Sequence, residues 1–176
     1  MTHIALFRGI NVGGKNILPM KALRSLLESL GAAAVRTYIQ SGNVLFEGKE
    51  DGSWSEKITE AVQEHHGFSP QVLLLSLADL EKVIAQNPYP EAVADPKRLQ
   101  VGFLAAAPTA PNLEKLETLR IDSERCAIIG KAFYLHAPDG IGKSKIAAGA
   151  EKAIGVPMTV RNWNTVLQIR ALAETG

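Results

Sequence analysis

A glycine-rich, basic segment near the N-terminus carries the clearest chemical potential in this chain. The letters RGINVGGKN occupy residues 8–16, directly after a short apolar run. Glycines allow backbone N–H groups to approach an anion and to adopt positive φ angles. Arg8 and Lys15 supply positive charge at the two ends of the segment. The pattern predicts a cradle for an anion, and the alternative is a flexible surface turn in which the glycines serve only geometry.

The length of this segment supports a functional role. It belongs to a connection over residues 9–18, between a predicted strand and a helix that begins at Pro19. Such connections usually have about two to six residues, and long loops in compact domains are often functional. We therefore expect Asn11, Gly13 and Gly14 to contact the ligand together with the two cations.

A second group of polar side chains is predicted on one face of a strand over residues 35–40. Alternation places Arg36, Tyr38 and Gln40 on the same face of that strand, and Asn43 follows in the next turn. A guanidinium, a phenol and an amide in a row are suited to orienting a polar ligand. The alternatives are a solvated sheet face or a face that packs on the other half of the chain.

The segment APDGIGKSK at residues 137–145 matches a relaxed phosphate-binding loop, with alanine at the position of the first glycine. The preceding strand is expected in an antiparallel hairpin, whereas nucleoside triphosphatases carry this loop in a parallel sheet. No acidic residue is evident that would help to hold Mg²⁺. Nucleotide hydrolysis is therefore not predicted, but Ser144 and Lys145 are candidates for binding phosphate or carboxylate at a helix start. The alternative is a helix start with solvated lysines.

A last polar stretch, RNWNT, begins at Arg161 where a strand meets the final helix. Asn164 or Thr165 is predicted to cap that helix, because both side chains accept hydrogen bonds from backbone N–H groups. Trp163 is expected to anchor the core. Arg161 and Asn162 are left as candidates for contacting a ligand.

Groups for covalent or metal chemistry are sparse in this sequence. The four histidines show no metal-binding spacing, so no metal site is predicted. Cys126 begins an apolar strand, where a cysteine is more often a core residue than a nucleophile. No nucleophile and base are recognisable as a pair, so the sequence leaves open whether the protein is an enzyme and whether it uses a cofactor.

Composition narrows the class of protein. The 176 residues are 46% hydrophobic and 21% charged, which is typical of a soluble globular protein. A net charge of +1 disfavours a dedicated nucleic-acid binder, and Phe7 and Phe46 are expected in the core rather than on an RNA-binding face. The lone cysteine, the lack of an apolar run long enough to span a membrane and the lack of a signal peptide favour the cytoplasm.

The periodicity of apolar residues predicts the same order of elements twice. Strands are expected at 3–8, 35–40, 44–47 and 71–75 in the first half and at 100–105, 126–129, 132–136 and 157–161 in the second, with helices after the first and third strand of each half. Capping boxes are predicted at Ser53-x-x-Glu56, Ser76-x-x-Asp79 and Thr165-x-x-Gln168. The fold class is α+β: two ferredoxin-like βαββαβ halves with antiparallel sheets, each followed by an extra helix. The predicted domains are 1–87 and 99–176, joined by a proline-rich linker over 88–98.

Several stretches together resemble a known family. They are RGINVGGK from Arg8, YIQSGNVLF from Tyr38, the pair Ser144-Lys145 and RNWNTV from Arg161. In this order they resemble the domain-of-unknown-function family 1697 over essentially the whole chain. The resemblance implies a bacterial-type cytoplasmic protein with a duplicated ferredoxin-like fold, and it implies no particular activity.

These observations favour one function over two others. The leading hypothesis is a binding site for a small anionic, phosphate-bearing ligand, formed by Arg8, Asn11, Gly13, Gly14, Lys15, Arg36, Tyr38, Gln40 and Asn43, with Ser144, Lys145, Arg161 and Asn162 in the same site or a second one. One alternative is a nucleic-acid-binding module on the sheet of the first half. The other is an interaction protein whose loops dock a partner or a second copy. The sequence predicts no oligomeric state.

Overall fold

The computed structural model describes residues 1–175, which form two compact units. The first unit contains residues Met1–Glu81 together with residues from Gln168 onward, and the second contains Lys82–Leu167. The division therefore falls inside two helices, α3 (Leu77–Ala85) and α6 (Trp163–Glu174). The proline-rich segment expected as a linker lies within the second unit, and part of it forms a short 3₁₀ helix.

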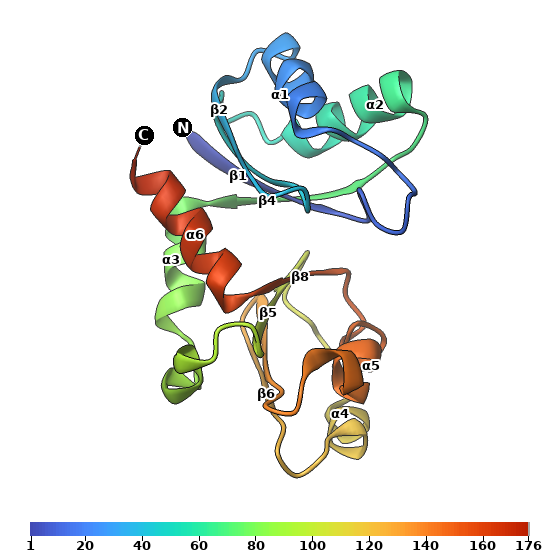
Figure 1. Cartoon of the computed structure of the whole chain (residues 1–176), viewed down its shortest axis with the longest axis vertical. Coiled ribbons are helices and arrows are strands. Elements are labelled where there is room, and N and C mark those ends of the chain that lie inside the picture. Colours follow the sequence, from blue (N-terminus) through green and yellow to red (C-terminus); the bar gives the residue numbers. More distant parts are fainter. Residues whose placement is uncertain (176) are drawn as a thin grey trace. The chain divides into compact units, whose positions relative to one another are not determined.

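The first unit has the element order βαββαβ. Its elements are β1 (Thr2–Arg8), α1 (Met20–Ser29), β2 (Ala33–Tyr38), β3 (Asn43–Glu47), α2 (Trp54–His66) and β4 (Gln71–Ser76). The strands lie in the order β2-β3-β1-β4, and each neighbouring pair is antiparallel. Helices α1 and α2 cover one face of this sheet (Figure 1). Phe7 and Phe46 pack there against Leu23 of α1 and Ile58 of α2.

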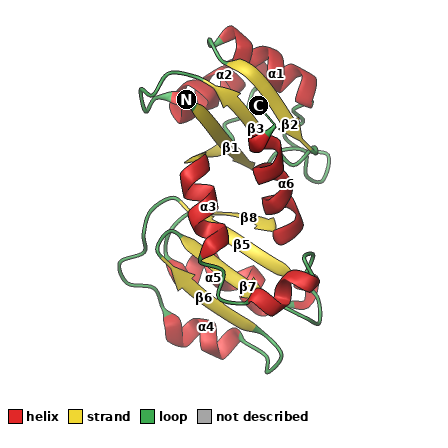
Figure 2. Cartoon of the chain, turned by 90° about the vertical axis from the view of Figure 1, so that its left-hand side faces the viewer, coloured by secondary structure: helices red, strands yellow, loops and turns green. Residues whose placement is uncertain are grey.

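The second unit repeats this order after α3 and the 3₁₀ helix Pro90–Ala94. Its elements are β5 (Leu99–Leu104), α4 (Leu113–Leu119), β6 (Arg125–Ile129), β7 (Ala132–His136), the 3₁₀ turn Ile141–Lys143, α5 (Lys145–Ile154) and β8 (Met158–Asn162). The antiparallel sheet has the order β6-β7-β5-β8. Figure 2 shows both sheets in yellow, each with a pair of helices against one face. The expected α+β class with two similar halves is confirmed.

Side chains are buried on both faces of the first sheet. Phe7 and Phe46 point toward the helices, whereas Ile4, Leu6 and Leu45 alternate with them and are also fully buried. Central strands that are apolar on both faces leave no room for a polar ligand over the middle of the sheet. A row of polar side chains like the one predicted at residues 35–40 does not continue onto the inner strands. Among the described residues, no helix is long and apolar enough to cross a membrane.

One of the three predicted capping boxes forms. The Ser76 backbone N–H donates to Asp79 Oδ2 at 3.0 Å, and the Asp79 N–H donates to Ser76 Oγ at 3.1 Å. Ser53 makes no such bond to the helix, because its N–H and O–H both donate to Asp51, two residues earlier. That prediction is wrong.

The last helix is capped one turn earlier than predicted. Asn162 Oδ1 accepts the Thr165 N–H at 2.9 Å, and α6 begins at Trp163. Asn162 is thus the cap, and Thr165 is the residue whose amide is capped. Trp163 is buried, as expected of a core anchor.

The turn between β2 and β3 depends on glycine at position 42. Gly42 has a φ of +80°, and a Cβ placed there would lie 2.6 Å from Phe7 Cβ and 2.7 Å from Ile10 Cδ1. Its carbonyl accepts the Phe7 N–H at 2.8 Å. The turn therefore packs directly on the end of β1, and this contact requires a residue without a side chain.

We expect Gly42→Ala to lower the free energy of unfolding by about 3 kcal/mol, since it combines a left-handed backbone with overpacking. Gly13→Ala is the matched control. Gly13 also has a positive φ but has open space around its Cβ position, so its loss should be about 1 kcal/mol. Urea unfolding of both variants measures the difference, and equal losses would contradict the packing argument.

The carboxyl group of Asp51, just before α2, should make the stability of the protein depend on pH. A hydrogen bond from Lys57, followed by those from Ser53, holds the pKa of the Asp51 carboxyl well below its usual value of 3.8. A depressed carboxyl pKa stabilises the fold above the unfolded-state pKa, and this contribution is lost as pH falls through the folded-state value. Asp51→Asn should therefore have a lower Tm than the unmodified protein at pH 7, and the gap should narrow below about pH 4. A gap that stays constant from pH 7 to pH 2 would show that the charge of Asp51 has no part in it.

Candidate functional site

The loop over residues 9–18 is held in place by the side chain of Asn11. Its Nδ2 donates to the carbonyls of Leu18 and Gln40, both at 2.9 Å, and its Oδ1 accepts the Leu18 N–H at 2.7 Å. The backbone N–H of Asn11 also donates to the Asn16 carbonyl at 3.1 Å. One amide thus ties the start of the loop to its end and to the β2–β3 turn. Asn11 has a structural role here, which differs from the ligand contact expected from the sequence.

The tip of this loop is a small turn that closes on itself. The Lys15 N–H donates to the Val12 carbonyl at 3.1 Å, and Gly13 and Gly14 between them have φ angles of 59° and 73°. Two successive positive φ angles are typical of a tight hairpin turn, which explains both glycines. Asn16 Nδ2 donates to the Gly9 carbonyl at 2.9 Å and fixes the turn from the other side. The glycine amides and Lys15 are exposed at the surface.

Arg36 and Tyr38 alternate with Thr37 along β2, and Asn43 pairs with Tyr38 across the hairpin. Arg36 is partly buried, and its guanidinium donates to the Leu172 carbonyl of α6. Asn43 is fully buried, and its Nδ2 donates to the Tyr38 carbonyl at 3.0 Å and to Ser41 Oγ at 3.1 Å. Asn43 therefore closes the hairpin between β2 and β3.

The remaining predicted residues of the first unit lie at its surface. Arg8 is exposed and donates to Gln71 Oε1 at 3.2 Å. Tyr38 is half-buried, and Gln40 is exposed.

In the second unit, the predicted residues lie at two helix starts. Ser144 is buried and caps α5, since its Oγ accepts the Ala147 N–H at 3.1 Å, and Lys145 is exposed. Asn162 caps α6, as described above. Arg161 occupies the opposite face of β8 from Asn162, because successive strand residues alternate. Burial lowers its pKa to about 10, and Nη1 donates to the Val160 carbonyl.

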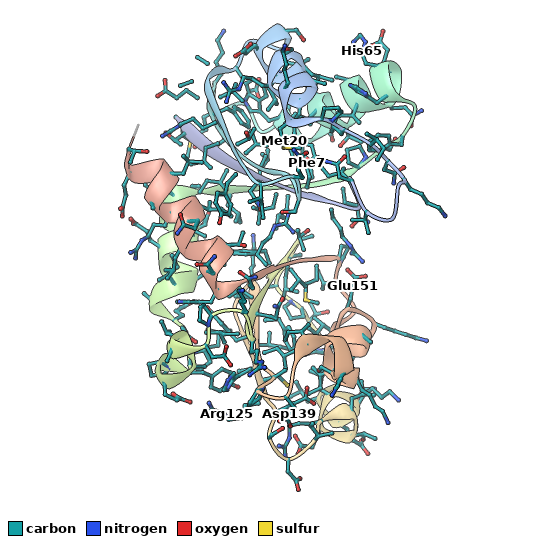
Figure 3. The ribbon with its side chains drawn as sticks, in the orientation of Figure 1. Phe7, Met20, His65, Arg125, Asp139 and Glu151 are labelled. Atoms are coloured by element: carbon teal, nitrogen blue, oxygen red, sulfur yellow. The ribbon has the colours of Figure 1, made fainter. Side chains whose placement is uncertain are left out.

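A cavity of about 410 Å³ lies at the edge of the first sheet, between α1 and β2. It is lined by Met20, Lys21, Arg24, Ser25 and Thr37. The three polar residues of α1 follow at i, i+3 and i+4, so they share one face of the helix. Met20, labelled in Figure 3, packs against the core of this unit, which includes Phe7. The cavity thus has an apolar floor and a rim of two cations and two hydroxyl groups.

The electrostatics of this cavity favour an anion. Pro19 is the N-cap of α1 and offers no side-chain acceptor, and the first turn has no acidic residue. The positive end of the helix dipole is therefore neither capped nor neutralised, and Lys21 adds charge of the same sign. The sequence around it is also basic, because Glu28 is the only acidic residue between Arg8 and Phe46. A bound anion would relieve this repulsion.

The sequence prediction missed the residues of this cavity. None of the predicted ligand contacts lines it, and Thr37 lies on the face of β2 opposite to Arg36 and Tyr38. One signal was available. Cations in the first turn of a helix oppose the helix dipole, and such a conflict with a local rule is often found at functional sites.

A second polar cluster, in the second unit, is internally neutralised. Arg125 forms an ion pair with Glu91, and its guanidinium carbon lies 4.5 Å from the centre of the Tyr89 ring. Arg125 Nη2 also lies 3.2 Å from His136 Nδ1, and because arginine can only donate, Nδ1 is the acceptor. A backbone hydrogen bond and, to a smaller extent, the side-chain hydrogen bond from Arg125 lower the pKa of Glu91. Since a carboxylate already balances the arginine, this cluster is a poorer anion site than the cavity.

The described residues offer little for covalent or metal chemistry. Burial raises the pKa of the Cys126 thiol, so the reactive thiolate is disfavoured. No group of three or more His, Cys, Asp or Glu side chains in residues 1–175 is arranged to hold a metal ion.

Comparison with known proteins identifies the family and supports the fold. The chain belongs to the family described as "Protein of unknown function (DUF1697)", whose model matches residues 1–134. No match was found among curated proteins. The solved structure of the conserved bacterial protein SP0830 from Streptococcus pneumoniae is similar, with 27% sequence identity, a TM-score of 0.73 and coverage of 97% of each chain. The similarity supports the duplicated fold over its whole length.

The role of Asn11 can be measured by substitution. Asn11→Ala removes three hydrogen bonds, each worth about 0.5–1.5 kcal/mol, so we expect a loss of about 2–4 kcal/mol of stability and faster hydrogen exchange at the Leu18 amide. Asn16→Ala removes the bond to Gly9 and should cost about 1 kcal/mol. If the two variants proved equally stable, the loop would not depend on Asn11 in the way described.

Proposed function

We propose that the first unit binds a small phosphate-bearing anion in the cavity between α1 and β2. The observation that carries this proposal is the pairing of Lys21 and Arg24 on one face of α1, at a helix start that lacks a cap and an acidic residue. Helix N-termini bind phosphate and carboxylate groups through their N–H groups and dipole. Here two side-chain cations reinforce that preference.

Size and polarity fit a small molecule. Binding cavities for small molecules usually measure about 300–1,000 Å³, and this one has about 410 Å³. Arginine and lysine bind phosphate oxygens by charge-assisted hydrogen bonds, while the hydroxyl of Thr37 adds a neutral partner. The thioether of Met20 offers an apolar surface for the remainder of the ligand. A sugar phosphate or a nucleotide has this combination of groups.

Arg8, Lys15 and the glycine turn contribute in this proposal by extending the positive potential of the same unit. They do not line the cavity, so they are expected to raise the association rate more than the affinity. The proposal assigns no ligand contact to Tyr38 or Gln40. The residues Lys145 and Arg161 of the second unit are not part of the proposed site.

The proposal is tested with inorganic pyrophosphate and ribose 5-phosphate by isothermal titration calorimetry. Arg24→Ala should weaken binding at least about ten-fold, or 1.4 kcal/mol, because it removes a charge-assisted hydrogen bond. Its Tm should change little, since Arg24 is exposed. Lys152→Ala removes the same charge from an exposed position on α5 and is the matched control.

Two outcomes would contradict the proposal. One is the absence of binding to the unmodified protein, and the other is an equal loss in Arg24→Ala and Lys152→Ala, which would indicate a non-specific effect of charge. A short RNA included in the same series tests the alternative. Binding of RNA alone, with an affinity that falls steeply as salt is raised, would favour a nucleic-acid-binding module.

A further inference from the structure

The second unit contains a separate, apolar cavity of about 250 Å³ on the helix-covered side of its sheet. It is lined by Gln100, Phe133, Leu135, Ile141, Ala147, Met158 and Val160. Phe133, Leu135 and Met158 are nearly fully buried and form its floor. Gln100, Ile141 and Ala147 are half-buried, and Val160 is exposed, so these residues form a rim that is open to solvent.

A glycine on the sheet and an alanine on the helix shape the two sides of this space. Gly102 lies on β5 between Gln100 and Leu104, and a Cβ placed there would collide with the side chain of Met158. Met158 thus occupies the position of the missing side chain. On the helix side, α5 begins with the alanine-rich stretch KIAAGA, and Ala147 is the residue of that stretch that lines the cavity. A methyl group there reaches less far than the aliphatic side chains elsewhere in the core.

The chemistry of the lining defines the occupant. None of the seven lining residues carries a charge, which excludes an ionic ligand on grounds of desolvation. The one polar group is the amide of Gln100 at the rim. Its Nε2 lies 3.5 Å from the Lys97 carbonyl, at the upper limit of a hydrogen bond, so little is lost when it turns to a ligand.

We propose that this cavity binds a small neutral molecule with an apolar body about the size of a six-membered ring and one hydrogen-bonding group that pairs with Gln100. An engineered apolar cavity of about 150 Å³ binds benzene, so 250 Å³ accommodates a ring with a substituent. The flexible thioether of Met158 adapts the floor to the shape of the ligand. This site lies in the second unit, has an uncharged lining and takes a neutral ligand, so the proposal does not depend on the anion site of the first unit.

The test uses phenol as the probe and methyl ¹H–¹³C NMR spectra of the full-length protein as the readout. Phenol should cause saturable shifts at the methyl groups of Leu135, Ile141, Ala147 and Met158, with a Kd of about 1 mM or tighter. Ala147→Leu fills the cavity and should weaken binding at least about ten-fold, since the probe and the new side chain compete for one space. Ala148→Leu, at the exposed neighbouring position of the same helix, should leave the Kd unchanged.

Two further variants keep the outcome decisive. Ala147→Val adds less volume and replaces Ala147→Leu if leucine prevents folding. Gln100→Met removes the amide at nearly constant size, so it should weaken phenol but not benzene. The proposal is overturned if phenol gives no saturable shifts, if the shifts survive the substitutions at Ala147, or if Gln100→Met affects both probes equally.

Discussion

Burial of both faces of the first sheet is the constraint on which the rest of that unit depends. The central strands β1 and β3 carry Phe7 and Phe46 toward the helices and Ile4 and Leu45 toward the other side, all without contact with solvent. Polar chemistry is thereby confined to edge strands, loops and helix starts. The basic cavity lies where this constraint ends, because β2 is the edge strand and Thr37 meets the exposed start of α1 there.

The order of elements could be predicted because apolar periodicity is a local property that the tertiary structure did not override. The helix starts show the limit of such reasoning. At Ser76 the predicted bonds form with Asp79. At Ser53 they do not form, because Asp51 offers a charged acceptor to both donors of the serine. At Thr165 the amide is capped by Asn162, three residues upstream, and the helix begins sooner. A capping-box pattern considers one pair of residues, so it does not take into account other hydrogen-bond acceptors near the same serine or threonine.

The candidate site was harder to predict than the fold for a related reason. Asparagine and glycine suggest ligand contacts, but they are also the residues that best build tight turns, and Asn11 and Asn43 use their side chains for that purpose. The basic cavity, in contrast, combines one face of α1 with a single residue of β2. How closely that face approaches the strand is a matter of packing distance, which no sequence spacing specifies. The apolar cavity of the second unit was not predicted for the same reason, since it arises where the small side chain of Ala147 leaves space between α5 and the sheet.

The path of the chain has a consequence for the order of folding during synthesis. The second unit is continuous from Lys82 to Leu167, whereas the first is completed only when the chain from Gln168 onward returns to it. Arg36 is synthesised early, whereas Leu172, whose carbonyl accepts a hydrogen bond from Arg36, is synthesised late. Domains generally fold as units while the chain emerges from the ribosome. The N-terminal unit, although most of it is translated first, therefore cannot be completed before the chain from Gln168 onward is available.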